Sequence, residues 1–276
     1  MSGLLLEPIA VRPSGAASWS GPSAIRRVTS RASDAAPLAT LCVVASLVVV
    51  WILERVLSGQ VHRGLTIGYL AFGGLPNAGI VGRGDPSQLW RWVSSGLVHD
   101  RSTPLHVISN SLALIMVGSV IERLYGRVAL LACVALGVVA GSFTWLEASA
   151  LGLAGESEYT IGLSPGICAL IGVLLVYGYR RRGDLSRELS QAMRAQATVG
   201  IGLMALLGLV VPNLNNLAHA GGLVAGVMIG VCLPVTQPGR PLTLSWRTRM
   251  VFSVVLAASA AAILFAGENL IWRLNG

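Results

Sequence analysis

Long apolar runs separated by shorter polar segments are the main pattern of this chain. Several of the runs approach the ~20 residues that a helix needs to cross the hydrocarbon core of a bilayer. The pattern therefore predicts an all-α, polytopic membrane protein. The seven predicted spans are residues 38–57, 105–121, 128–146, 161–179, 197–211, 217–235 and 250–266.

The amino-acid composition excludes an ordinary soluble domain. Hydrophobic residues fill 54% of the 276 positions and charged residues only 12%, whereas about 25% of a soluble domain is charged. The formal net charge is +8, and all 20 basic residues are arginines. Because these arginines cluster between the apolar runs, we expect them to orient the chain in the membrane rather than to bind nucleic acid. The four cysteines lie inside apolar runs without metal-type spacing, so neither a disulfide nor a metal site is expected.

The charges between the runs predict which side of the membrane each loop faces. Arginines are concentrated in the tail 1–36 and in the loops after the fourth and sixth runs, while the loop after the third carries Glu156 and Glu158 without arginine. Positive loops stay in the cytoplasm, so we expect a disordered cytoplasmic tail and a C-terminus on the outside. The first loop, 58–103, also carries arginines, but long loops count less in this rule.

Four polar residues lie near the start of the three spans that enter from the outside. His106 and Asn110 share one face of the second span because they are four residues apart. Ser164 opens the fourth span and His219 the sixth. At 1.5 Å per residue, all four fall within roughly 10 Å of the outer hydrocarbon boundary. Each alone is compatible with helix packing or an interhelical hydrogen bond, but their shared depth favours a nucleophile and its base.

Small residues predict that the fourth and sixth spans pack closely. Gly222, Gly226 and Gly230 recur every fourth residue in the sixth span, and such a stripe lets another helix backbone approach. Ordinary membrane packing explains the same stripe, but close contact would also bring Ser164 and His219 within hydrogen-bonding distance. The matching smooth face of the fourth span is formed by Gly162, Gly166, Ala169 and Gly172.

Pro165, directly after the serine, restricts the chemistry that this site can use. Proline suits the first turn of a helix, so Ser164 is expected to cap the fourth span. Because Pro165 has no backbone N–H, it cannot help to bind an oxyanion. The remaining donors are the Ser164 amide, the Asn110 side chain and His106.

In their order along the chain, these residues resemble the rhomboid intramembrane serine proteases over about half of the sequence, from Gln88 to Gly230. Each motif is weak by itself, and their order on these spans makes the resemblance specific. The family usually has glycine after the serine, where this chain has Pro165. The matching motifs are Trp90-Arg91, His106-x-x-x-Asn110, Glu122-Arg123-x-x-Gly126, Gly162-Leu163-Ser164 and His219-Ala220-Gly221-Gly222-x-x-x-Gly226.

The resemblance implies a catalytic dyad without an aspartate, with Ser164 as the nucleophile and His219 as the general base. His106 and Asn110 would bind the oxyanion. It also implies a rhomboid-like core of six helices, here residues 37–235, followed by a loop and a seventh transmembrane helix within 236–276. The motif residues with an implied structural or packing role are Trp90, Arg91, Glu122, Arg123, Gly126, Gly162, Gly166, Gly222 and Gly226.

The implied activity is cleavage of single-pass transmembrane proteins in or near their membrane segment, without a metal or organic cofactor. Such substrates and membrane lipid are the expected partners, and a bacterial cell membrane is the expected location, with an organellar membrane as the alternative. The competing interpretation is a catalytically weak or inactive rhomboid-like protein that binds transmembrane helices as a chaperone or trafficking factor. A small transporter fits less well, because the sequence shows no inverted repeat and no acidic residue in the middle of a span.

Overall fold

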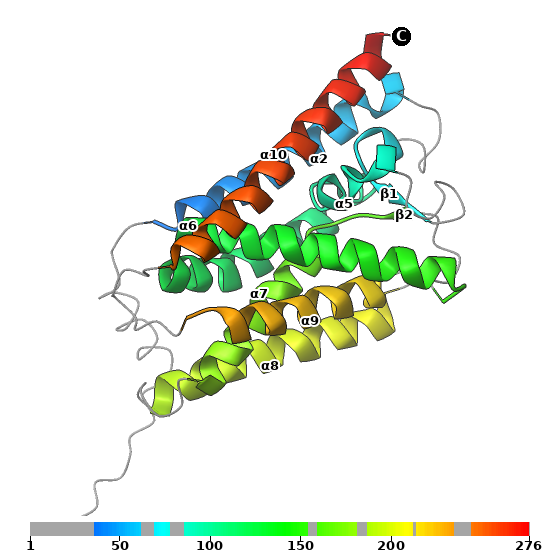
Figure 1. Ribbon diagram of the computed structural model, residues 1–276. Helices are drawn as coiled ribbons and strands as arrows, with labels where there is room; N and C mark the ends of the chain where they lie inside the picture. Colours follow the sequence, from blue (N-terminus) through cyan, green and yellow to red (C-terminus); the bar gives the residue numbers. More distant parts are fainter. Residues whose placement is uncertain are drawn as a thin grey trace, which may run out of the picture.

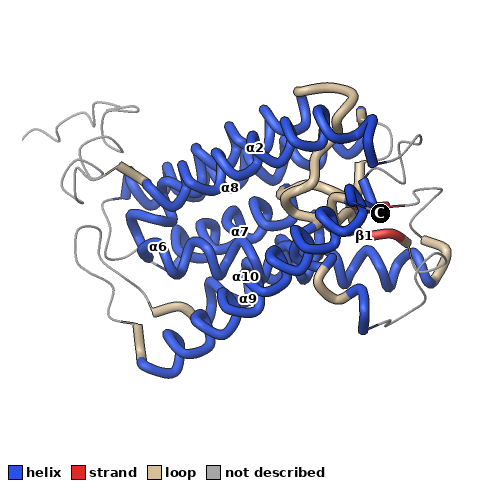
Figure 2. The backbone as a smooth tube through the Cα atoms, turned by 90° about the horizontal axis from the view of Figure 1, so that it is seen from above, coloured by secondary structure: helices blue, strands red, loops and turns tan. Residues whose placement is uncertain are grey.

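Helices make up most of this protein, whose computed structural model describes residues 36–61, 69–77, 86–153, 159–180, 187–211, 214–234 and 244–275. Of the described residues, 82% are helical, and strand occurs among them only as a small antiparallel pair (Figure 2). The helices are α2 (Leu38–Val61), α5 (Arg91–Ser94), α6 (Leu105–Ala150), α7 (Ser164–Arg180), α8 (Arg187–Val210), α9 (Asn216–Cys232) and α10 (Trp246–Asn275). The remaining elements are the 3-10 helix η1 (Pro86–Gln88) and the strands β1 (Leu75–Pro76) and β2 (Tyr159–Thr160).

Several of these helices are suited to a bilayer. Within the described ranges, α2, α6, α8 and α10 are long and apolar enough to cross a membrane, and α7 and α9 are apolar but shorter. The prediction of an α-helical integral membrane protein is therefore confirmed. The predicted division into six core helices and one appended helix stays a prediction. The tail predicted to be disordered lies outside the described residues, apart from residue 36.

Two boundaries differ from the sequence prediction. The spans expected over 105–121 and 128–146 lie on either side of a kink in α6, where the non-helical residue Gly126, at φ 82°, separates two helices that follow each other without the expected loop. Glycine adopts this backbone conformation without a steric penalty, so the helical hydrogen bonding resumes directly after it. The span expected from residue 161 becomes helical only at Ser164, after a non-helical segment in which Gly162 has φ +109°.

The centre of the fold is a contact between backbones rather than between large side chains. A Cβ atom added to Gly222 would lie 2.1 Å from the carbonyl oxygen of Pro165, and one on Gly226 would lie 2.0 Å from that of Ala169. Both distances are impossible for a real side chain, so α9 and α7 touch through their main chains, as small residues permit between membrane helices. The glycine stripe seen in the sequence lies at this contact. Helix α6 packs against both helices (Figure 1).

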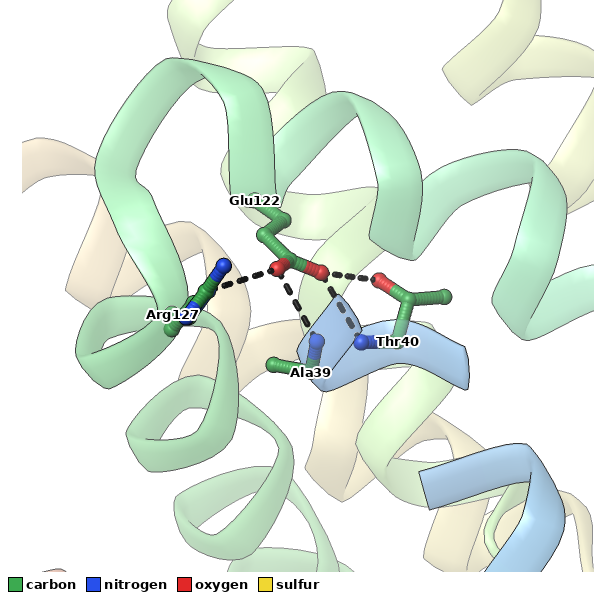
Figure 3. Close-up of polar contacts among 4 residues, drawn as sticks. All are labelled: Ala39, Thr40, Glu122 and Arg127. Atoms are coloured by element: carbon green, nitrogen blue, oxygen red, sulfur yellow. Dashed lines mark hydrogen bonds and ion pairs between the residues drawn. The ribbon is translucent and has the colours of Figure 1, made fainter. Parts of the chain in front are cut away.

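The first helix is attached to α6 by a buried carboxylate (Figure 3). Glu122, 8% exposed, accepts hydrogen bonds from the backbone N–H groups of Ala39 and Thr40 at 3.0 and 2.8 Å. The Thr40 hydroxyl donates a third bond at 2.8 Å, and Arg127 forms an ion pair with Glu122 at 3.6 Å. The first N–H groups of a helix have no partner in their own helix, so Glu122 satisfies the start of α2.

The segment before α6 is held by the Trp90-Arg91 motif. The Arg91 guanidinium is buried and donates to the carbonyl oxygens of Leu70 and Gly74 at 2.6 and 2.9 Å. It also lies 4.2 Å from the centre of the Trp90 ring, which is in edge contact with Phe265 of α10 at 5.8 Å between centroids. Helix α10 thus rests on α5 and also contacts α2 and α6 (Figure 1).

Candidate active site

Ser164 and His219 meet where α7 and α9 begin. The Ser164 hydroxyl oxygen lies 2.7 Å from His219 Nε2, and the imidazole is 8% exposed. Ser164 is the first residue of α7. His219 is in the first turn of α9, where its backbone N–H donates to the carbonyl of Asn215 at 3.2 Å. The backbone contact between these two helices therefore places a hydroxyl and an imidazole in hydrogen-bonding contact.

The surroundings of His219 Nδ1, the ring nitrogen that does not face Ser164, bear on which nitrogen of the imidazole carries the proton. Among the described residues, His219 Nδ1 is buried without a hydrogen-bond partner. When the neutral ring carries its proton on Nδ1, Nε2 is free to accept the hydrogen of the Ser164 hydroxyl. No carboxylate in the described part of the chain orients this ring, so the arrangement is a pair rather than a triad.

Gly162 borders the space between Ser164 and His106, and its backbone lies directly against the His106 ring. A Cβ on Gly162 would lie 2.7 Å from His106 Nε2 and 3.9 Å from the Ser164 hydroxyl oxygen. The residue has φ +109°, and its N–H donates to the carbonyl of Ser95 at 2.9 Å. Glycine is thus required here both by the backbone conformation and by the close approach of the His106 ring. An oxygen atom placed in this space would lie close to a nitrogen of His106.

Asn110 lies one turn further along α6 than His106. Its side-chain nitrogen donates to the His106 carbonyl at 2.9 Å, and its side chain is nearly buried. An amide nitrogen has two hydrogens, so one of them is not used by this bond. Within the described part of the chain, its side-chain oxygen has no hydrogen-bond partner.

The loop before α6 contacts the other face of His106. The Asp100 backbone N–H donates to His106 Nδ1 at 3.4 Å, and the His99 ring lies 4.9 Å from the His106 ring. His99 is fully buried, and burial, with a smaller effect from His106, lowers the pKa of His99 to about 4. Burial alone would raise the pKa of Asp100, but hydrogen bonds from Ser102 and Tyr69 hold it below its ordinary value.

The structure separates the predicted residues into two groups. Ser164, His219, His106 and Gly162 come together, with Asn110 beside them. The second group supports the fold, with Gly166 packed against Val134 of α6 and Gly222 against Pro165 beside the serine. Arg123 is the exception, because it is exposed and nothing in the structure explains it. This group consists of Trp90, Arg91, Glu122, Arg123, Gly126, Gly166, Gly222 and Gly226.

Sequence reasoning missed Asn215. Its side-chain oxygen accepts the Ala218 N–H at 3.0 Å, which caps α9, and its side-chain nitrogen donates to the Thr160 hydroxyl at 2.8 Å. Asparagine is a preferred N-cap, so its position just before the sixth span was a usable signal. The hydrogen bond to Thr160 joins positions 55 residues apart, so no local sequence pattern could predict it.

A mostly apolar cavity of about 290 Å³ adjoins the histidine. Residues of α7, α8 and α9 line it, among them Cys168, Ile201 and His219. Cys168 is one turn after Ser164 on the same face of α7. The imidazole therefore borders a mostly apolar, partly open cavity on the α8 side. No group of three His, Cys, Asp or Glu side chains in the described ranges could hold a metal ion.

The fold and this site define an integral membrane protein with a serine and a histidine paired at the mouths of two packed helices. Residues 86–235 match the family model described as the Rhomboid domain. This match covers more than half of the 276 residues, and the chain belongs to the rhomboid family.

Curated relatives agree with this assignment. Over 198 residues the chain is 26% identical to the rhomboid protease GluP of Bacillus subtilis, which covers 72% of this chain and 35% of the relative. It is 30% identical to the rhomboid protease GlpG of Haemophilus influenzae over 147 residues, 52% of this chain and 69% of the relative. It is also 30% identical to rhomboid-type serine protease 2 of Emericella nidulans over 174 residues, 59% of this chain and 31% of the relative. The chain thus spans about a third of the length of GluP and of the Emericella protein.

Proposed function

We propose that this protein is an intramembrane serine endopeptidase in which Ser164 is the nucleophile and His219 the general base. The observation that carries the proposal is the 2.7 Å contact between the Ser164 hydroxyl and His219 Nε2. Family membership supports it, because the relatives just described are named as proteases.

The proposed reaction uses the imidazole as base and then as acid. His219 Nε2 takes the hydroxyl proton while the Ser164 oxygen attacks a substrate peptide carbonyl. The resulting imidazolium gives this proton to the leaving amine, which breaks the peptide bond and leaves an ester on Ser164. Water then attacks the ester with His219 again as base, and the acid product leaves as the serine regains its proton. Without a carboxylate partner, the buried position of the ring in α9 has to orient it.

The oxyanion of the tetrahedral intermediate is proposed to occupy the space between Ser164 and His106 that Gly162 borders. His106 Nε2–H and the second side-chain N–H of Asn110 are its side-chain donors. The Ser164 amide is a third donor, because the first N–H groups of α7 have no partner in their own helix. Pro165 removes the next amide along the chain, which makes the side-chain donors more important here.

The proposed substrates are single-pass transmembrane proteins cut in or near their membrane segment. A transmembrane helix keeps its carbonyls in hydrogen bonds, so the segment near the cut has to unwind before Ser164 can attack. The charge pattern supports a cytoplasmic N-terminus and an active site that opens to the outside of a bacterial cell membrane. In this arrangement residues 37–235 form the six-helix catalytic core, and residues 236–276 supply a loop and the seventh transmembrane helix.

Labelling with a fluorophosphonate probe tests the assignment of the dyad. We expect labelling of the wild type, loss of labelling in Ser164→Ala and near-complete loss in His219→Ala, because members of a catalytic unit act together. Ser46→Ala is the matched control: Ser46 is an exposed membrane-helix serine whose hydroxyl donates to its own helix at 2.9 Å, and this variant should label normally.

Co-expression with a single-pass substrate supplies the second arm of the test. Cleavage products that disappear in Ser164→Ala would support the protease. Full cleavage by His219→Ala would eliminate the proposed base. Stable capture of transmembrane helices by a wild type that neither labels nor cleaves would favour the alternative, an inactive rhomboid-like binding protein.

A further inference from the structure

The end of α2 holds the loop that leads into His106. Three side chains from its last turns make hydrogen bonds to three successive residues of this loop. The Glu54 carboxylate accepts the His99 N–H at 3.3 Å, and Trp51 Nε1–H donates to the Asp100 carbonyl at 2.8 Å. Arg55 donates to the Arg101 carbonyl at 2.5 Å. Positions 51, 54 and 55 share one helix face, so α2 presents them together to one stretch of backbone.

This stretch of backbone determines how His106 is protonated. The Asp100 N–H donates to His106 Nδ1, and a nitrogen that accepts a hydrogen bond carries no proton. The proton of the neutral ring is then on Nε2, the nitrogen next to the space at Gly162. Which ring nitrogen carries the proton is set by the hydrogen bond that the other one makes. Only this tautomer can donate a hydrogen bond to an oxyanion in that space.

The loop is also fixed from its outer side. The Tyr69 hydroxyl donates to the Asp100 carboxylate at 2.9 Å and accepts the Arg101 N–H at 3.2 Å. The Ser102 amide and hydroxyl donate to the same carboxylate at 2.8 and 2.6 Å. The peptide groups around Asp100 are therefore held on both sides, and the direction of the Asp100 N–H follows from these bonds.

Burying the Glu54 carboxyl group carries a free-energy cost that a purely structural role for the residue would not explain. Glu54 is 1% exposed on a mostly apolar helix that the rest of the protein covers poorly. Burying a carboxyl group is unfavourable unless its hydrogen bonds are satisfied, and leucine would fill the same place without this penalty. Its hydrogen bonds in the structure go to the His99 N–H, one peptide away from the amide that contacts His106.

We propose that Glu54 and Trp51 are positioning residues for His106, which fix the His99–Asp100 backbone so that His106 keeps its proton on Nε2 and faces the oxyanion. The inference rests on the proposed function for its kinetic consequence but not for the tautomer itself. Neither residue touches the reacting atoms, and both act through the main chain of the loop.

The test combines nitrogen NMR of the histidine rings with kinetics on the full chain in lipid nanodiscs. With ¹⁵N-labelled histidine, and with His106→Gln to assign the signal, the wild type should show His106 protonated on Nε2. In Glu54→Leu and in Trp51→Phe we expect a mixture of tautomers. Glu54→Gln keeps an acceptor of the same shape and should retain the wild-type tautomer.

Cleavage of a single-pass substrate gives the second measurement. Loss of one oxyanion donor lowers kcat by 10²–10³ in other enzymes, so a partly misplaced His106 should lower kcat by about 10- to 100-fold. KM should change by less than about twofold, and Glu54→Gln should recover most of the rate. Leu47→Ala is the control, because Leu47 is a fully buried residue of α2 whose loss disturbs packing without touching the loop. It should lower thermal stability and leave the His106 tautomer unchanged.

The outcomes separate this inference from the proposed function. An active protease whose Glu54→Leu and Trp51→Phe variants keep both the wild-type tautomer and kcat would overturn the inference alone. A tautomer change of equal size in Leu47→Ala would also overturn it, because the effect would then be general loosening. A chain with no protease activity, but with a tautomer that depends on Glu54, would refute the proposed function and leave the positioning intact.

Discussion

Substitution of Gly162 by alanine tests the proposed oxyanion space most directly. The new Cβ would lie 2.7 Å from His106 Nε2 and 2.8 Å from its neighbouring ring carbon, whereas ordinary contacts begin at 3.4 Å. The His106 ring therefore has to retreat by about 0.7 Å, or the segment before α7 has to shift. The backbone conformation at φ +109° adds strain on the order of 1–3 kcal/mol for a residue with a side chain.

The kinetic effect follows from the displacement of the donor. A misplacement of about 1 Å lowers rates roughly 10²-fold, and removal of an oxyanion donor lowers kcat by about 10²–10³. We therefore expect Gly162→Ala to lower kcat by about 100-fold, which corresponds to about 3 kcal/mol of transition-state stabilisation. The assay is the initial rate of cleavage of a purified single-pass substrate in liposomes over a range of substrate concentrations.

Gly152→Ala is a matched control for this experiment. Gly152 also has a positive φ, +73°, but a Cβ there would meet nothing within 4 Å. This variant should lose about 1 kcal/mol of stability through backbone strain alone and keep its kcat. If Gly162→Ala cleaved as fast as Gly152→Ala, the space beside Ser164 would not be the oxyanion site and the reasoning would be refuted.

Three further predictions concern stability, pH and substrates. Glu122→Ala leaves the Ala39 and Thr40 N–H groups without their acceptor. It should cost about 3 kcal/mol, seen as a lower Tm, and an unchanged Tm would contradict this role. The unfolded state takes up a proton on His99 as pH falls below 6.5, whereas the folded state does not until about pH 4. Stability should therefore decrease by roughly 3 kcal/mol between these values; a denaturation series should show this slope, and an equally steep slope in His99→Gln would argue against it. Replacing a helix-breaking Gly or Pro near the substrate cleavage site by Leu should lower kcat/KM about tenfold, and unchanged cleavage would show that unwinding is not limiting.

The pairing of Ser164 and His219 could be foreseen because its causes are local. Each residue opens an apolar span, and the small residues that let the two helices touch recur at helical spacing in the same two segments. The place of Pro165 in the first turn of a helix could also be predicted from local sequence, and α7 does begin at Ser164. The catalytic roles given to these residues are still predictions.

The support of His106 could not be foreseen, because it depends on tertiary contacts. Glu54 and His99 are 45 residues apart, and nothing near either residue indicates that they meet. Glu54 lies near the end of the predicted span 38–57, where a charged side chain ordinarily reaches the interface, whereas the structure buries it. The break within α6 was predicted between residues 121 and 128, but its place and form were not: a positive φ at the single residue Gly126 leaves no mark in hydropathy.

The main-chain contact between α7 and α9 limits how this molecule can change. With Pro165 and Ala169 carbonyls lying directly against Gly222 and Gly226, no layer of side chains remains whose size could adjust the spacing of the two helices. A methyl group added at Gly222 or Gly226 would push α9 away from α7 and move the His219 imidazole away from the Ser164 hydroxyl. Changes that preserve the contact between Ser164 and His219 are therefore left to the loops and to α8, around two helices whose spacing is fixed.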